Sequence, residues 1–270
     1  MAFDPSRGAA LLVGMPDCAN TEMWTWKGKR WTLQPNRSPF PGGPEPGLAL
    51  DPGSGRIAYF LGPPTWTWNG RTWRQRPLDG EPPYRQGMGL ATDPSSGHVL
   101  MFGGATKVGH DDTWRWDGKS WTELHPAAAP PARASMAFAA GPNGTVVLFG
   151  GSDPSCQGSP CVLGDTWTWN GTDWTRQHPA HSPPSGSGMG MAYDQAAGVD
   201  VLFGGSAGNE TWTWDGIDWT LRQPAHSPPQ LIDMGMGYDE AAQQIVVYGG
   251  SDSGDTWTWD GVDWTRHPAP

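Results

Sequence analysis

The residues of this chain whose types and spacing can support chemistry are unrepeated charged side chains in predicted loops. They are Arg85 in "PPYRQGMG", Arg133 in "PPARASMA", Asp233, and the adjacent pair His110 and Asp111. Two arginines can bind an anionic group through bidentate hydrogen bonds, and a carboxylate or an imidazole can move a proton. The pattern predicts an anion clamp with His110, Asp111 and Asp233 as catalytic candidates. The alternative is that the arginines pair with loop carbonyls and that His110 faces solvent.

Three further loop residues complete the predicted ligand-binding set. Tyr84 precedes Arg85, and Asp17 and Cys18 lie in the segment "MPDCANTE". Binding residues concentrate on variable loops that a rigid scaffold positions, so these residues are expected to line a site. Cys18 is either a reactive thiol or a packed side chain.

A second set of acidic residues recurs along the chain. Each member directly precedes a Trp-rich segment, and Pro64 stands where a further member is expected; they are Glu22, Asp112, Asp165, Glu210 and Asp255. A circle of carboxylates can bind a cation or an amine. Recurrence favours a structural role instead, in which each carboxylate accepts backbone N–H bonds within its own repeat. No spacing matches a calcium loop or a zinc site, so no metal or cofactor is predicted.

The elements that must position these residues follow from a tryptophan repeat. Six segments carry three tryptophans at the same offsets, from "MWTWKGKRW" to "TWTWDGVDW", and they use all 18 tryptophans of the chain. Their leading members are separated by 42, 48, 53, 45 and 45 residues; they are Trp24, Trp66, Trp114, Trp167, Trp212 and Trp257. A period near 45 residues is typical of propeller blades. The rings are expected to pack between blades rather than to form a stacking surface for a ligand.

The last repeat shows how each unit is expected to fold. It predicts strands at 234–238, 245–248, 256–259 and 263–265, with "DG" in the tight turn before the fourth strand. Four short antiparallel strands make one blade. The sequence therefore predicts an all-β, six-bladed β-propeller that closes without exchange of a strand between its termini. The chain 1–270 is expected to be one domain, with blades at approximately 1–34, 46–76, 87–124, 135–177, 188–222 and 233–267.

A glycine pair after the second strand points to a family. It ends "MFGG" at Gly104, "LFGG" at Gly151, "LFGG" at Gly205 and "VYGG" at Gly250, and the first two repeats keep one glycine. This pattern resembles the kelch repeat over essentially the whole chain. The resemblance implies a propeller like those of kelch proteins and of the central domain of galactose-oxidase-like proteins. It implies no activity, and no tyrosine, histidine and cysteine set matches the copper site of galactose oxidase.

Composition excludes several classes of partner. The chain has 17 basic and 27 acidic residues, a net charge of −10, which argues against a nucleic-acid groove and an anionic membrane surface. No apolar run is long enough to span a bilayer, and "MAFDPSRG" does not resemble a signal peptide. Cys156 and Cys161 are close enough for a local disulfide, which hints at an oxidising compartment; two reduced thiols are the alternative. The compartment is otherwise unknown, and a monomer is expected.

Loop variation points to the working face. The segments between the second and third strands differ in every repeat, whereas the turns between the third and fourth hardly change. We therefore expect a recognition module that binds a small molecule, a glycan or a protein at the loop-rich mouth of the central channel. The alternative is a cofactor-free enzyme of the cyclase, isomerase or lyase type at the same face. Sequence alone does not decide whether the protein is catalytic.

Overall fold

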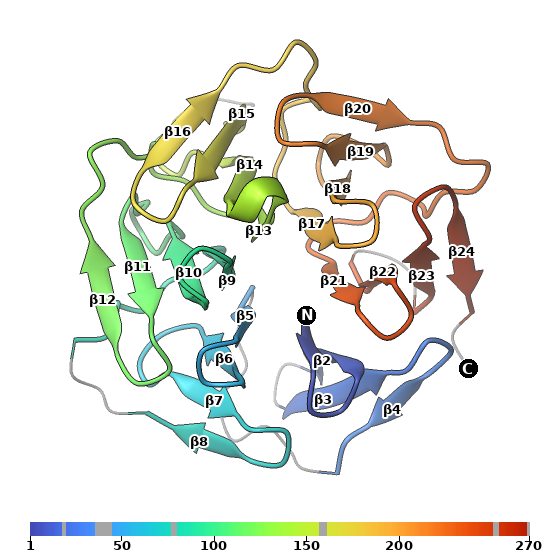
Figure 1. The fold of residues 1–270 in the computed structure, drawn as a ribbon, viewed down its shortest axis with the longest axis horizontal. Helices are drawn as coiled ribbons and strands as arrows, with labels where there is room; N and C mark the ends of the chain where they lie inside the picture. The colour runs from blue at the N-terminus through green and yellow to red at the C-terminus, as the bar shows by residue number, and fades with distance from the viewer. Residues whose placement is uncertain (18–19, 36–44, 77–79, 157–160, 251–253, 269–270) are drawn as a thin grey trace.

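In the computed structural model, six four-stranded antiparallel sheets stand in a ring around a central axis (Figure 1). Residues 1–17, 20–35, 45–76, 80–156, 161–250 and 254–268 are described. Each sheet consists of four consecutive strands, so no strand is exchanged between the first and last blades. Within each blade the first strand lies nearest the axis and the fourth lies at the rim, and we refer to the four strands in this order as a to d.

The bounds of the strands are as follows. Blade one contains β1 (Ala2–Asp4), β2 (Ala9–Asp17), β3 (Asn20–Trp26) and β4 (Trp31–Leu33), and blade two contains β5 (Gly47–Asp51), β6 (Arg56–Phe60), β7 (Trp66–Trp68) and β8 (Trp73–Gln75). Blade three contains β9 (Gly89–Asp93), β10 (His98–Phe102), β11 (Thr113–Trp116) and β12 (Trp121–Leu124), and blade four contains β13 (Ala137–Ala140), β14 (Val146–Ser152), β15 (Val162–Trp169) and β16 (Trp174–Gln177). Blade five contains β17 (Met189–Asp194), β18 (Val199–Gly204), β19 (Thr211–Trp214) and β20 (Trp219–Arg222), and blade six contains β21 (Gly235–Asp239), β22 (Gln244–Tyr248), β23 (Thr256–Trp259) and β24 (Trp264–His267).

The predicted strands of the last repeat agree with the structure to within two residues at each end. The main differences lie in the segments between strands b and c. In blade one β2 extends to Asp17, and in blade four β15 begins at Val162, so part of each predicted loop is strand. Both extensions follow a register shift, after Gly14 and after Phe149. A β-bulge allows strands b and c to remain paired beyond the point where their pairing ends in the other blades.

The second and third tryptophans of each repeat form the core between blades. Within every blade the two rings pack at centroid distances of 5.4–5.5 Å and tilt by 43–53°. In five blades the third ring also packs on an aromatic residue of strand b in the preceding blade, as Trp219 does on Phe149 at 5.3 Å; in blade two Trp73 packs on Tyr59 of its own blade. These contacts confirm the predicted packing role for two of the three tryptophans in each repeat.

A repeated hydrogen bond joins neighbouring blades. At five of the six junctions the third tryptophan donates through Nε1 to the threonine directly before the first tryptophan of the preceding repeat, as in Trp121 to Thr65 at 2.8 Å and Trp264 to Thr211 at 2.9 Å. The same bond closes the ring, because Trp31 of blade one donates to Thr256 of blade six at 2.7 Å. Blade six therefore meets blade one through the same contact that joins consecutive blades.

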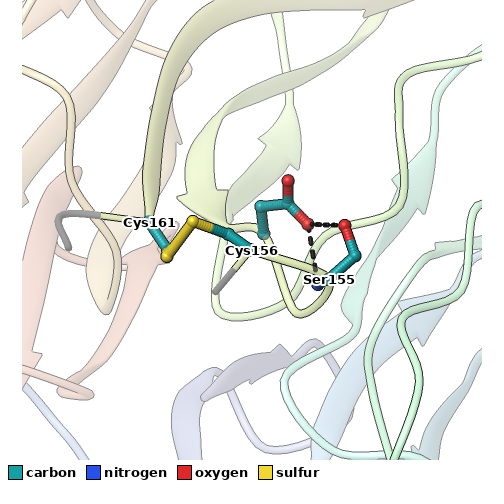
Figure 2. Close-up of a disulfide and its surroundings, with 4 residues drawn as sticks. Ser155, Cys156 and Cys161 are labelled. Carbon is teal, nitrogen blue, oxygen red and sulfur yellow. Dashed lines mark hydrogen bonds between the residues drawn. A yellow bond between two sulfur atoms is a disulfide. The ribbon is translucent and has the colours of Figure 1, made fainter. Parts of the chain in front are cut away.

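Cys156 and Cys161 form a disulfide in the loop that follows β14 (Figure 2). Their Cα atoms are 5.7 Å apart, and Ser155 donates to Asp153 through both its backbone N–H and its hydroxyl. The loop also reaches blade three, because a Cβ atom placed on Gly109 would lie 2.9 Å from the ring of Pro154. Among the described residues, no helix is long and apolar enough to cross a membrane.

Candidate functional site

A cavity of about 720 Å³ opens at one end of the central axis. Its wall consists of residues that enter strand a, end strand b or begin strand c, so it lies at the end where the b–c and d–a connections emerge. A volume of this size is typical of small-molecule sites. The apolar part of the wall includes Leu12, Trp24, Leu48, Tyr59, Tyr248 and the methionines that begin strand a, Met88, Met136, Met189 and Met234.

Five residues around the axis form what we call the channel collar. Each stands one or two positions before strand a of blades two to six, and each has left-handed backbone; they are Glu45 (φ 50°), Gly87 (φ 63°), Ser135 (φ 51°), Gly188 (φ 67°) and Asp233 (φ 57°). All five line the cavity. Residues with side chains avoid this conformation, which costs about 1 kcal/mol or more, and such outliers cluster at functional sites. Blades two, four and six therefore keep polar side chains where glycine would be less strained.

Hydrogen bonds join the collar into a continuous arc. The backbone N–H of Ser135 donates to Gly87 O at 2.7 Å, that of Gly188 to Ser135 O at 2.9 Å, and that of Asp233 to Gly188 O at 3.0 Å. The Ser135 hydroxyl donates to Glu45 Oε2 at 2.7 Å, across the glycine of the blade between them. The arc fixes the direction in which each collar side chain leaves the backbone.

Both collar carboxyls are shifted toward the protonated form. Glu45 and Asp233 are both exposed to solvent at the cavity mouth. The surrounding protein nevertheless desolvates them in part, which raises the pKa of Glu45; the negative charge of Asp233 raises it further, and the hydrogen bond from Ser135 opposes both effects. Partial desolvation also raises the pKa of Asp233. Glu22 adds a third carboxylate to the wall and accepts a 3.0 Å hydrogen bond from Trp24 Nε1. None of the described residues that line the cavity is a lysine, an arginine or a histidine, and burial lowers the pKa of the terminal amine of Met1, which also lines it, to about 6; at neutral pH the wall therefore has acidic character.

The structure places the two predicted clamp arginines elsewhere. Arg85 and Arg133 are fully buried and do not line the cavity. Arg85 donates to Pro83 O at 3.3 Å, to Gly103 O at 3.1 Å and to both carboxylate oxygens of Asp112. Arg133 makes the same four bonds one blade later, to Pro131 O, Gly150 O and Asp165. These contacts match the alternative in which the arginines pair within the loops, and they leave little of either guanidinium for a ligand.

The remaining predicted residues do not come together around one point. Asp233 lines the cavity, whereas His110, Asp111 and Tyr84 do not. His110 Nε2 is buried without a hydrogen-bond partner among the described residues, and burial lowers the pKa of the imidazole. Asp111 is exposed, and the exposed Tyr84 accepts a hydrogen bond from Gln86. Asp17 lies in β2, and Cys18 lies outside the described residues.

The recurrent carboxylates have a structural role, but their main donors are side chains rather than the predicted backbone N–H groups. Four of them accept a hydrogen bond from the indole two positions later, as in Asp112 from Trp114 and Asp165 from Trp167, both at 2.7 Å, and Glu210 from Trp212 at 2.8 Å. Asp255 instead accepts from Arg266 at 2.7 Å. No group of three or more metal-ligating side chains occurs in the part of the chain that the structure describes.

Sequence reasoning missed Glu45 and Ser135, although the signal was present. Aligning the repeats on strand a places both in the column that contains Gly87, Gly188 and Asp233. Only Asp233 stood out there, because it replaces glycine at a position expected to enter strand a. The left-handed conformation shared by the column is not visible from residue type when serine or glutamate occupies it.

Comparison with known proteins addresses the fold. No family model matches the chain, and no curated protein matches its sequence. Among solved structures, one described as "Structure of YjhT" superimposes with a TM-score of 0.61 over 84% of this chain and 84% of that chain. The chain is a six-bladed β-propeller. The two sequences are 15% identical, so the likeness shows the fold of the propeller alone, and the kelch resemblance stays a prediction.

Proposed function

We propose that this propeller is a recognition module that binds a small molecule with a positively charged group in the cavity at the channel mouth. The observation that supports this most strongly is a cavity of about 720 Å³ whose polar lining is irregular although the scaffold repeats. A blade does not need a carboxylate in the collar, since Gly87 and Gly188 serve the same backbone position in two blades. The presence of polar side chains at Glu45, Ser135 and Asp233 is therefore best explained by a role in binding a ligand.

The charge of the wall favours a cation. Glu22, Glu45 and Asp233 face a space that contains no basic side chain among its described lining residues. A partly desolvated carboxylate attracts an ammonium group more strongly than it would in water. Trp24, Tyr59 and the methionines that line the cavity supply an adaptable apolar surface for the rest of the ligand, and aromatic faces also attract cations.

Three probes of similar size test the charge preference. Phenethylammonium, 3-phenylpropanol and 3-phenylpropionate present the same ring with positive, neutral and negative groups. We expect phenethylammonium to raise the melting temperature of the wild type and to have little effect on Glu45→Gln or Asp233→Asn. Glu123→Gln removes an exposed carboxylate from β12 on the rim and should respond like the wild type. Equal responses to all three probes, or none to any, would contradict the proposal.

A second candidate function is acid–base catalysis without a cofactor. Burial raises the pKa of both Asp233 and Glu45, which brings the two carboxyls closer to the range where one can donate and the other accept a proton. An isomerase, cyclase or lyase would place the reacting atoms of its substrate between them. Conversion of a bound compound, with a bell-shaped pH profile that Asp233→Asn abolishes, would favour this candidate over simple binding.

A further inference from the structure

The two glycines of the channel collar face carboxylates rather than open space. A Cβ atom on Gly188 would lie 2.6 Å from Asp233 Oδ1 and 2.7 Å from Ile232 Cγ2. A Cβ atom on Gly87 would lie 2.6 Å from Glu45 Oε2, 2.8 Å from the backbone nitrogen of Ser135 and 2.9 Å from Ser135 Oγ. Real Cβ atoms essentially never approach other heavy atoms within 3.0 Å. The carboxylates therefore occupy the volume that any side chain at these positions would need.

Backbone conformation alone does not explain why these positions are glycine. Ser135 and Asp233 adopt nearly the same left-handed conformation in the same column of the repeat. The collar thus accepts a residue with a side chain, at some cost in strain, where the neighbouring blade leaves room for it. A carboxylate from an adjacent blade leans over each of Gly87 and Gly188, and at Gly87 the backbone nitrogen of Ser135 is close as well.

The two carboxylates lean toward the same part of the ring. Glu45 of blade two crosses Gly87 of blade three and reaches Ser135 of blade four. Asp233 of blade six lies over Gly188 of blade five. Both charges are thereby drawn to the side of the cavity formed by blades three to five, whereas the third carboxylate of the wall, Glu22, lies in blade one.

We propose that Gly87 and Gly188 are positioning residues of this cavity: without side chains, they let Glu45 and Asp233 lean across neighbouring blades and hold their carboxylates together at its mouth. The inference rests on the proposed function as far as ligand binding is concerned. The arrangement of the carboxylates is a separate property that can be measured without any ligand.

Two pairs of matched variants test the inference. Gly188→Ala is compared with Gly198→Ala, and Gly87→Ala with Gly97→Ala. Gly198 (φ 70°) and Gly97 (φ 68°) lie in turns of the same blades, and a Cβ atom on either would have no heavy atom within 4 Å. Each control therefore introduces the same left-handed alanine without moving a carboxylate.

The first measurement is the titration of the Glu45 and Asp233 side chains by carboxyl ¹³C NMR. Displacement of Asp233 in Gly188→Ala should lower the pKa of Glu45 toward its ordinary value, because the nearby negative charge that raises it moves away. Gly198→Ala should titrate like the wild type. An unchanged Glu45 titration in Gly188→Ala would overturn the inference.

The second measurement is the affinity for phenethylammonium. We expect a loss of at least tenfold in both collar variants and a change of less than twofold in both controls. If the wild type does not bind this probe but Gly188→Ala alone shifts the Glu45 titration, the positioning role holds and the proposed ligand class fails. Gly188→Ala is the decisive variant, because its alanine would meet only side-chain atoms, whereas alanine at 87 would also meet the Ser135 backbone nitrogen at 2.8 Å.

Discussion

Replacement of Asp200 by valine should stabilise the protein at neutral pH. Asp200 lies in β18, is 0% exposed, and neither carboxyl oxygen has a hydrogen-bond partner among the described residues. Its register partner on β17 is Tyr193. The residues that pair with the corresponding position of strand a in the other blades are all apolar and buried; they are Ala10, Ile57, Val99, Val146 and Ile245. Five blades thus show that an apolar side chain fits this environment.

The magnitude follows from the unsatisfied carboxyl. A buried polar group without a partner costs about 1–3 kcal/mol, and Asp200→Val removes that cost while it adds buried apolar surface. At about 2–4 °C per kcal/mol for a chain of this size, the melting temperature should rise by about 2–12 °C. Asp200→Asn keeps the polar group but cannot ionise, so its stability should lie between those of the wild type and the valine variant.

The stability difference between Asp200→Val and the wild type should depend on pH. Burial raises the pKa of Asp200 well above 3.8, so the unfolded state loses this proton at a lower pH than the folded state does. The contribution of Asp200 to stability is fully present below the unfolded pKa and is lost as pH rises through the folded pKa. The advantage of Asp200→Val should therefore shrink as pH falls toward 4. Urea unfolding at pH 4.5, 6 and 7.5 would measure it, and a valine variant that is less stable at pH 7.5 or has a constant advantage would refute the argument.

Three other outcomes follow from contacts described above. Thr256→Val, which removes the acceptor of Trp31 at the junction of the last and first blades, should lower the free energy of unfolding by about 1 kcal/mol in urea titrations, as Thr211→Val should at an internal junction. Arg85→Met removes the charged partner of Asp112 and should cost about 3–5 kcal/mol by the same assay while cation binding by the folded protein is unchanged; a stable variant that no longer binds would restore the arginine to the site. Affinity for phenethylammonium, measured by calorimetry, should fall as pH drops and should do so at a higher pH than an ordinary carboxyl titrates, because burial raises the pKa of Glu45; a flat profile would exclude these carboxylates.

The scaffold could be predicted from the sequence because its determinants repeat. The spacing of the tryptophans, the glycine pairs and the "DG" turns recur six, four and three times, and each copy checks the others. In the structure both glycines of the pair have left-handed backbone, as at Gly103 (φ 67°) and Gly104 (φ 91°). A local requirement of this kind is visible in residue type, because only glycine meets it without strain.

The candidate site was harder to predict because it depends on departures from the repeat. Unrepeated charge identified Asp233 and also Arg85 and Arg133, but residue type does not show where a side chain is directed. Arg85 faces Asp112 within its own blade, whereas Glu45 reaches a residue 90 positions away across an intervening blade. Such contacts depend on how adjacent blades are placed, which no property of a single repeat determines.

The hydrogen bond between Trp31 and Thr256 marks a seam in the ring. The two residues are 225 positions apart, and the blades they join are the pair in the ring that no short linker connects. Closing so long a loop has an entropic cost that the directly linked junctions avoid, so the ring should open locally at this junction first. Amide exchange should then be fastest along β1 and β21, which contact each other there. The cavity touches both sides of the seam, through Leu12 and Tyr248. A bound molecule would therefore contact both blades and stabilise the closed ring, so that ligand binding and closure of the ring would be thermodynamically linked.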